Sequence, residues 1–387
     1  MTKIAVISAM LGYSWGGSEY LWAAMASQAL ASGHEVFISV YESISHPLIT
    51  QIQEQGAQLL PLRKFPKVPS LAARITRRLK RNLPFLQESQ PESSYQPVFD
   101  CKPDVICISQ GGSYDAAVYA PDFLRLLHSA EIPYTIVCQF NADTYSLDSA
   151  AQTLAKQFFA LAARVAFVSR HNLKLAERQV AQSLPNAVVV QNPVNLSDIS
   201  AIAWSERAMK SFASVARLEV AFKGQDVLLE ALSLPIWQER DWQCRLYGAG
   251  PDRAYLEELA RHYGIADRVK FMGYVNDVRS IWSENHLLIL PSRAEGTPLA
   301  LVEAMLCGRP AVVTDVGGNA EWIEEPMTGF IAEAPTARSL SAALERAWLA
   351  SANWNPMGVT AHEYATARLD NSPGKSLLDI VLAATKS

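Results

Sequence analysis

The strongest constraint on the fold is a repeated alternation of short apolar, β-branched runs with helix-like stretches. In the first half, the runs expected to form strands are residues 4–8, 36–40, 105–109, 134–138, 165–168 and 188–191. The alternation restarts in the second half, at residues 212–215, 243–247, 269–271, 287–290 and 311–314. Apolar runs separated by helices indicate parallel strands covered on both faces. The sequence therefore predicts two successive α/β units.

The length of 387 residues also favours two domains, because a single hydrophobic core seldom grows past roughly 250–300 residues. We expect a Rossmann-like domain over residues 1–195 and a second one over residues 196–365. Residues 366–387 are expected to form a helix that crosses back to the first domain. In open parallel sheets, ligands bind beyond the carboxyl ends of the strands. Two such sheets predict a ligand site in a cleft between the domains.

Charge and cysteine usage exclude several classes of protein. The net charge of −4 gives no global case for nucleic-acid binding. The five cysteines form no C-x-x-C pair, which argues against a zinc site or a disulfide framework and for a reducing compartment. The N-terminus lacks the length and flanks of a signal peptide, and no uncharged apolar run approaches the roughly 18–20 residues that span a bilayer. We expect a cytoplasmic protein.

The most informative segment for chemistry is residues 291–321. Thr297 suits a helix N-cap and Pro298 the first helical position, while Gly308 suits the helix end. Glu295 then lies in the loop before the helix, and Glu303 lies on the helix eight positions later. The N–H groups and positive dipole of a helix N-terminus suit phosphate. The expected donors are the backbone amides of Gly296, Leu299 and Ala300. From spacing alone, one capping and one solvent-facing glutamate is the simpler interpretation.

Two cationic residues form a second group of candidate site residues. Arg217 and Lys223 fall between a strand that ends near Val215 and a helix that begins near Gln225. Cations beyond a strand end suit a diphosphate, because arginine binds it in bidentate fashion and lysine adds a point charge. Taken alone, two solvated surface cations are the safer interpretation. Glycine turns after strands at 16–17, 248–250 and 317–318 allow close approach of a phosphate, but α/β folds need such turns anyway.

Taken together, these motifs carry a family resemblance. The matching segments are GGSE at 16–19, GHEV at 33–36, FVS at 167–169, NPV at 192–194, ARLEVAFKG at 216–224, YGAGP at 247–251, FMGYVNDV at 271–278, EGTPLALVEAM at 295–305 and TDVGGNAE at 314–321. In this order they resemble the family-4-type retaining glycosyltransferases (glycosyl transferases group 1), which have the GT-B fold of two Rossmann-like domains. The resemblance implies an enzyme that moves a sugar from a UDP- or GDP-sugar to a carbohydrate or lipid-linked acceptor, in cell-surface polysaccharide or glycolipid synthesis.

The resemblance also implies roles at the reacting end of the donor. Arg217 and Lys223 would hold the diphosphate and neutralise it as it leaves, and Glu295 would lie beside the transferred sugar. The departing phosphate and the incoming hydroxyl would share one face of the sugar, so its anomeric configuration is kept. The family usually needs no metal ion or cofactor, and no Asp-x-Asp motif occurs in the expected cleft segments.

Further implied contacts hold the nucleoside and close the site. Glu303 would bind the ribose hydroxyls, and Tyr274 and Val275 would contact the nucleobase. Gly16 and Gly17 would close the site from the first domain. The remaining expected donor contacts are Gly296, Thr297, Leu299 and Ala300.

Two positions depart from the family pattern. Family members often carry histidine where this chain has Gln139, near the reacting carbon. A glutamine amide binds a sugar through hydrogen bonds but takes no proton at neutral pH. The second departure, Ala216 in place of glycine, is small. Gln139 keeps open the alternative of a catalytically impaired nucleotide-sugar-binding relative or an assembly component. An NAD-dependent oxidoreductase is disfavoured, because the first strand leads to no compact G-x-G-x-x-G.

One segment of the first half is strongly basic. Residues 62–87 contain eight lysines and arginines and no acid. Within it, residues 71–81 have the pattern of an amphipathic helix, with four arginines beside or opposite the apolar stripe: Arg74, Arg77, Arg78 and Arg81. Such a helix suits the anionic inner face of a membrane or an anionic acceptor. The alternative is a solvated helix whose stripe packs on its own domain.

Overall fold

The structure is a computed structural model that describes residues 1–10, 15–41, 44–62, 93–119, 121–206 and 208–386. The basic segment with Arg74, Arg77, Arg78 and Arg81 lies outside the described residues. Among the described helices, none combines the length and apolar character that a membrane span requires.

The first sheet is fully parallel and has the order β3-β2-β1-β4-β5-β6-β7. Its strands are β1 Lys3–Ser8, β2 Glu35–Ser39, β3 Gln58–Leu59, β4 Val105–Gly112, β5 Tyr134–Phe140, β6 Arg164–Phe167 and β7 Ala187–Val189. Its helices are α1 Glu19–Ala31, α2 Pro47–Glu54, α4 Gln96–Asp100, α5 Asp115–Tyr119, α6 Pro121–Ala130, α7 Ser149–Leu161 and α8 Arg170–Val180. β1 and β4 are buried along almost their whole length, as the apolar runs predicted.

The second sheet is also parallel, with the order β10-β9-β8-β11-β12-β13. Its strands are β8 Lys210–Val215, β9 Trp242–Tyr247, β10 Val269–Gly273, β11 Leu287–Leu290, β12 Ala311–Thr314 and β13 Gly329–Ala332. The helices after β8 are α9 Val220–Lys223, α10 Gln225–Ser233, α11 Arg253–His262, α12 Val278–Glu284, α13 Leu299–Leu306, α14 Ala337–Leu349, α15 Trp354–Arg368 and α16 Pro373–Ala383. The predicted class of two doubly wound α/β sheets is confirmed.

In both sheets the strand order reverses beside the strand that comes first in the sequence of that domain. The reversal lies between β1 and β4 in one sheet and between β8 and β11 in the other. At such a point the two following loops run to opposite sides and leave a crevice between them. The loops after β8 and β11 are the segments that contain Lys223 and Glu295.

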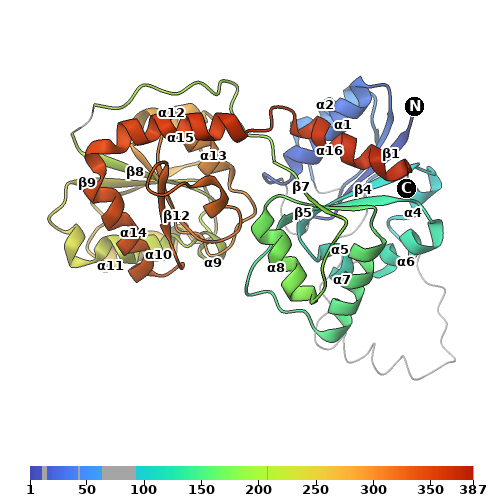
Figure 1. Ribbon diagram of the computed structural model, residues 1–387, viewed down its shortest axis with the longest axis horizontal. Coiled ribbons are helices and arrows are strands. Elements are labelled where there is room, and N and C mark those ends of the chain that lie inside the picture. The colour runs from blue at the N-terminus through green and yellow to red at the C-terminus, as the bar shows by residue number, and fades with distance from the viewer. Residues whose placement is uncertain (11–14, 42–43, 63–92, 120, 207, 387) are drawn as a thin grey trace.

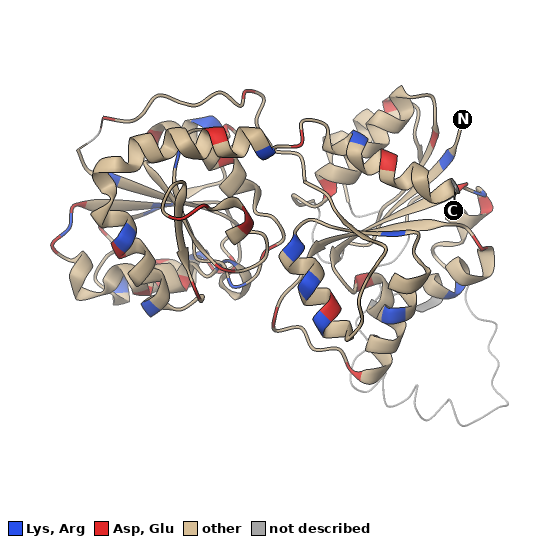
Figure 2. Cartoon of the chain, in the orientation of Figure 1, with Lys and Arg blue, Asp and Glu red and all other residues tan. Residues whose placement is uncertain are grey.

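The chain crosses twice between the two sheets, and Figure 1 shows both crossings between the two lobes. The first follows β7, and the second joins α15 to α16, which lies on the first lobe beside α1. Gln191 connects the crossings: its Nε2 donates to the Arg368 carbonyl at 2.8 Å, and its Oε1 accepts from the Asp370 N–H at 2.8 Å. Acidic and basic residues are interspersed along the helices of both lobes (Figure 2).

Candidate functional site

The centre of the site is an ion pair between the two loops of the second sheet. Lys223 Nζ lies 2.7 Å from Glu295 Oε1 and 2.8 Å from Oε2. The Glu295 side chain is 5% exposed and that of Lys223 is 25% exposed. The sequence predicted both residues, but it placed Lys223 in a loop, whereas it is the last residue of the one-turn helix α9.

The loop of Glu295 is held from several sides. Ser292 Oγ donates to Glu295 Oε1 at 2.7 Å, and Thr314 Oγ1 donates to the Ser292 carbonyl at 2.6 Å. Gly317 has φ +53, and a Cβ there would lie 2.3 Å from the Glu295 carbonyl oxygen. The glycine turn after β12 therefore lets the backbone pack directly on this loop, and the carboxylate is fixed in position.

Arg217 forms an ion pair within its own loop. Its guanidinium Nη2 lies 2.6 Å from Glu219 Oε2, and the side chain is 45% exposed. The Arg217 carbonyl accepts a hydrogen bond from Gln225 Nε2 at 2.7 Å, which fixes the backbone of this loop against α10. Arg217 thus lies on the same loop as Lys223, with its guanidinium engaged locally.

The helix that follows Glu295 begins at Leu299, and Pro298 is its N-cap residue. The prediction that Thr297 caps the helix was wrong, because the Thr297 hydroxyl instead donates to the Val168 carbonyl of the first domain. The predicted glycine end is confirmed: Gly308 has φ +76, and its N–H donates to the Met305 carbonyl. Gly296, Leu299 and Ala300, the predicted amide donors, lie at the N-terminal end of this helix.

Glu303 is buried on α13, with the Asn195 N–H donating to its Oε1 at 3.0 Å. Burial raises the pKa of the Glu303 carboxyl, and the Asn195 hydrogen bond opposes that rise. The two residues predicted to contact the nucleobase differ in exposure: Tyr274 is 74% exposed, and Val275 is partly buried.

Tyr20, near the start of α1, was not among the residues that the sequence predicted for this site. Burial raises the pKa of the Tyr20 phenol, and the nearby Tyr274 and Glu303 raise it further. Tyr20 of the first domain is therefore within electrostatic range of two of the predicted nucleoside contacts. Its place directly after the GGSE segment was the available signal.

The first domain contacts the Glu295 loop closely. A Cβ on Gly17 would lie 3.3 Å from Leu299 Cδ1, and a Cβ on Gly296 would lie 2.1 Å from the Gln139 carbonyl oxygen. Asn172 Nδ2 donates to the Glu295 carbonyl at 2.9 Å. Gly17 thus lies next to the start of α13. Gly16 has no close neighbour that a side chain would strike.

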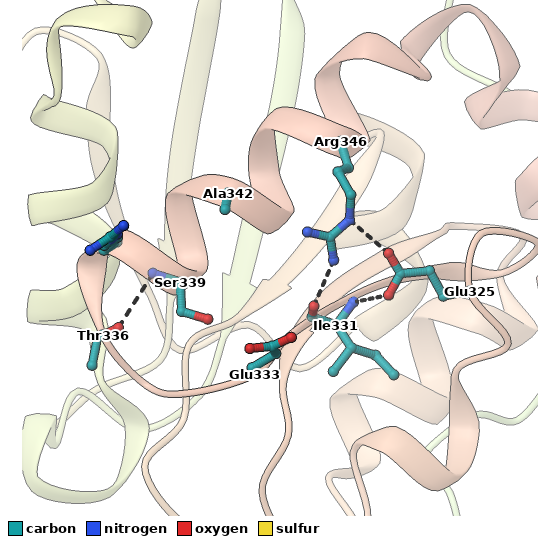
Figure 3. Close-up of a pocket in the computed structure, with 8 residues that line it drawn as sticks. Glu325, Ile331, Glu333, Thr336, Ser339, Ala342 and Arg346 are labelled. Atoms are coloured by element: carbon teal, nitrogen blue, oxygen red, sulfur yellow. Dashed lines mark hydrogen bonds and ion pairs between the residues drawn. The ribbon is translucent and has the colours of Figure 1, made fainter.

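Two cavities in the described part of the chain lie away from the Lys223–Glu295 pair. The larger, of ≈ 540 Å³, lies between β13 and α14 (Figure 3). Its charged lining residues are Glu325, Glu333, Arg338 and Arg346. In the described ranges, no three His, Cys, Asp or Glu side chains gather in a way that suits a metal ion.

Residues 210–349 match the family described as Glycosyl transferases group 1. An uncharacterized glycosyltransferase of Haemophilus influenzae is 32% identical over 149 residues, which are 38% of this chain and 41% of that protein. The phosphatidylinositol N-acetylglucosaminyltransferase gpi3 subunit of Schizosaccharomyces pombe is 30% identical over 151 residues, 38% of this chain and 31% of that one. The alignments thus span less than half the length of these relatives. The crystal structure of Anabaena Alr3699/HepE in complex with UDP-glucose superposes with a TM-score of 0.74 at 17% identity, covering 99% of this chain and 100% of that one. The predicted GT-B fold is confirmed.

Proposed function

We propose that this chain, whose residues 210–349 belong to the glycosyl transferases group 1 family, is a retaining glycosyltransferase. Its donor would be a UDP- or GDP-sugar, and its acceptor a carbohydrate or lipid-linked molecule of cell-surface polysaccharide or glycolipid synthesis. The named activity of the Schizosaccharomyces pombe relative and the UDP-glucose bound by the Anabaena structure support this choice. The reaction would need neither a metal ion nor a cofactor, and EDTA should leave the rate unchanged.

The Lys223–Glu295 pair is the observation that carries the proposal. A buried carboxylate costs free energy unless a cation compensates it, and here one lysine contacts both of its oxygens. When a donor binds, the Lys223 ammonium would turn to a diphosphate oxygen, and Glu295 would accept hydrogen bonds from the sugar hydroxyls. Lys223 would then stabilise the charge that develops on the leaving phosphate.

Retention would follow from a front-face displacement. The bond between the anomeric carbon and the phosphate oxygen breaks, and the acceptor oxygen attacks from the same face. The acceptor proton passes to the departing phosphate oxygen, so no side chain has to act as a base. Gln139, which takes no proton, is compatible with this route.

Nucleotide binding and two substitutions test the proposal. UDP or GDP should raise the melting temperature, because a ligand of the folded state stabilises it by RT ln(1 + [L]/Kd). Lys223→Ala and Arg217→Ala should each lower turnover of the correct donor by roughly 10²–10³-fold, since a charge-assisted contact in a desolvated site contributes about 2–4 kcal/mol. Lys270→Ala, an exposed lysine of the same sheet, is the matched control and should have no effect. Near-normal turnover in either variant would remove that residue from the site.

The alternative, a catalytically impaired relative, has its own test. Such a protein would bind the nucleotide sugar without cleaving it. Slow hydrolysis of the donor in the absence of an acceptor, abolished by Lys223→Ala, would exclude it.

The basic segment of residues 62–87 supports the further proposal that the protein acts at the cytoplasmic face of an anionic membrane. Co-sedimentation with phosphatidylserine vesicles should fall as salt rises and when Arg74, Arg77, Arg78 and Arg81 are changed to serine. Neutral phosphatidylcholine vesicles are the control. If anionic vesicles bind no protein at low salt, only the anionic-acceptor role remains.

A further inference from the structure

We propose that Gln139 is a positioning residue that ties the first interdomain crossing to the glycine loop, residues 16–18, and thereby keeps the two domains closed around the donor. The consequence for donor binding rests on the proposed function. The tie itself rests on contacts between parts of the protein.

Both ends of the Gln139 amide are engaged. Its Nε2 donates to the Ser18 carbonyl at 3.1 Å, and its Oε1 accepts from Asn192 Nδ2 at 2.8 Å. Ser18 directly follows the Gly16-Gly17 pair, and Asn192 lies in the crossing after β7. One buried side chain, 5% exposed at the end of β5, therefore joins two segments that are 174 residues apart (192 − 18).

The main chain of Gln139 contacts a third segment. A Cβ on Gly296 would lie only 2.1 Å from the Gln139 carbonyl oxygen. The end of β5 therefore packs directly on the Glu295 loop. A separation of the domains would draw the Glu295 loop away from β5 and bend the chain at the crossing. Gln139 therefore lies where the crossing, the glycine loop and the Glu295 loop meet.

A neutral amide suits this tie chemically. Glutamine both donates and accepts, so one side chain satisfies a carbonyl on one side and an N–H on the other. A carboxylate would repel the Ser18 carbonyl, and an apolar side chain would leave both partners unpaired in a buried place, which is costly. Among the described residues, Asn192 Oδ1 is buried without a partner, so the bond from Nδ2 to Gln139 fixes that side chain.

If Gln139 ties these segments together, changing it should alter the binding of a bare nucleoside diphosphate, whereas a residue that only contacts the sugar should not affect that binding. A residue that touches only the transferred sugar leaves the binding of a bare nucleoside diphosphate unchanged. A residue that holds the domains closed affects that binding as well, because closure and binding are linked.

The first measurement is hydrogen exchange of the ligand-free protein, which does not depend on the proposed function. In Gln139→Leu, exchange should become faster both near residues 16–19 and near residues 191–195. Gln110→Leu is the matched control, since Gln110 is a buried amide whose partners, Ser113, Ala116 and Cys138, belong neither to residues 16–19 nor to residues 191–195. If both segments of Gln139→Leu exchange as in the wild type, the tie does not exist. Asn192→Ala removes the same bond from the other end and serves if Gln139→Leu fails to fold.

The second measurement is calorimetric titration with UDP and with GDP. Gln139→Leu and Asn192→Ala should each weaken the nucleotide that binds by about 10-fold, within the usual 5–150-fold range of coupling between sites. The double variant should be no weaker than either single one, because both remove the same tie. Unchanged affinity in Gln139→Leu, or additive losses in the double variant, would overturn the inference. Fast exchange in Gln139→Leu together with a wild type that binds neither nucleotide would leave the tie standing and refute the proposed function.

Discussion

Glu295 and Glu303 are both buried carboxylates, but their surroundings differ. Glu295 is paired with the Lys223 ammonium, whereas Glu303 receives only the Asn195 N–H among its described polar contacts. A paired, ionised carboxylate is suited to a changing charge distribution. A buried carboxyl whose pKa is raised is suited to binding neutral hydroxyls that stay the same throughout the reaction.

The two glutamates should therefore fail in different ways when changed. Glu295→Gln should lower kcat by roughly 10–10²-fold, since one charge-assisted hydrogen bond contributes about 1.5–3 kcal/mol. Glu303→Gln should raise the donor KM about 10-fold with little change in kcat, because ribose contacts are equal before and during the reaction. Steady-state kinetics on the identified donor separate the two, with the exposed Glu257→Gln as control. The reverse pattern would mean that the roles are exchanged.

Glu19 gives a pH-dependent prediction. It is 1% exposed, and burial raises the pKa of its carboxyl from 4.5 to about 7, against the opposing hydrogen bonds from Ser8, Trp22 and Ser18. The folded state thus holds a proton that the unfolded state releases near pH 4.5, so this group lowers the free energy of unfolding as pH rises from about 4.5 to about 7. Glu19→Gln should be more stable than wild type at pH 8 and equally stable at pH 4.5. Urea unfolding at both values checks this, with the exposed Glu54→Gln as control. If the free energies of unfolding of Glu19→Gln and wild type differed by the same amount at pH 8 and at pH 4.5, the prediction would be refuted.

At the scale of elements, the sequence predicted fully buried apolar strands best. The expected bounds of β11 and β12 match the structure, and the other expected strands are within a few residues. β3 and β13 were missed; β3 has only two residues, too few to give a pattern, and β13 begins with a glycine, so its apolar run is shorter than that of β11. Thr297 has a good local signal for a cap, but the Val168 carbonyl of the other domain competes for its hydroxyl. The sequence likewise put Lys223 and Glu295 in neighbouring loops without predicting their direct pair, which depends on tertiary geometry.

The missed strand β13 is a free sheet edge with its own protection. At Ile331 the N–H donates to Glu325 Oε2 at 3.0 Å, and the carbonyl accepts from Arg346 Nη2 at 2.8 Å. Arg346 Nε also lies 2.8 Å from Glu325 Oε1, so one ion pair occupies both backbone groups (Figure 3). Exposed edges pair with other chains unless they are blocked.

Removing this ion pair should make the protein self-associate. In the double variant Glu325→Ala and Arg346→Ala, we expect dimers or larger species at tens of micromolar by analytical ultracentrifugation, with a loss of stability of only about 0–1 kcal/mol. Arg338→Ala changes a cation of the same cavity that has no bond to Ile331, and it should match the wild type. A double variant that sediments like the wild type would show that the ion pair does not protect the edge.

At the scale of the whole molecule, sequence order and packing diverge at the C-terminus. Helix α16 follows the second sheet in sequence but packs on α1 of the first (Figure 1). Gly374 permits this contact, because a Cβ there would lie 2.6 Å from the Ala24 carbonyl carbon. Leu377 and Val381 are fully buried in the core of the first sheet. The stability of the first domain therefore depends on residues translated after the second.

Leu377→Ala should destabilise the first domain selectively. Truncation of a fully buried leucine costs about 2–5 kcal/mol, through lost burial and the cavity left behind. Hydrogen exchange should become faster in β1 and β4 and remain unchanged in β8 and β9, because none of the core contacts of Leu377 belongs to the described core of the second sheet. Leu349→Ala is the control: that leucine is 75% exposed at the end of α14, so its truncation should change stability by no more than about 0.5 kcal/mol. Equal acceleration in both sheets would mean that the two domains unfold as one cooperative unit, and the selective dependence of the first domain on α16 would be wrong.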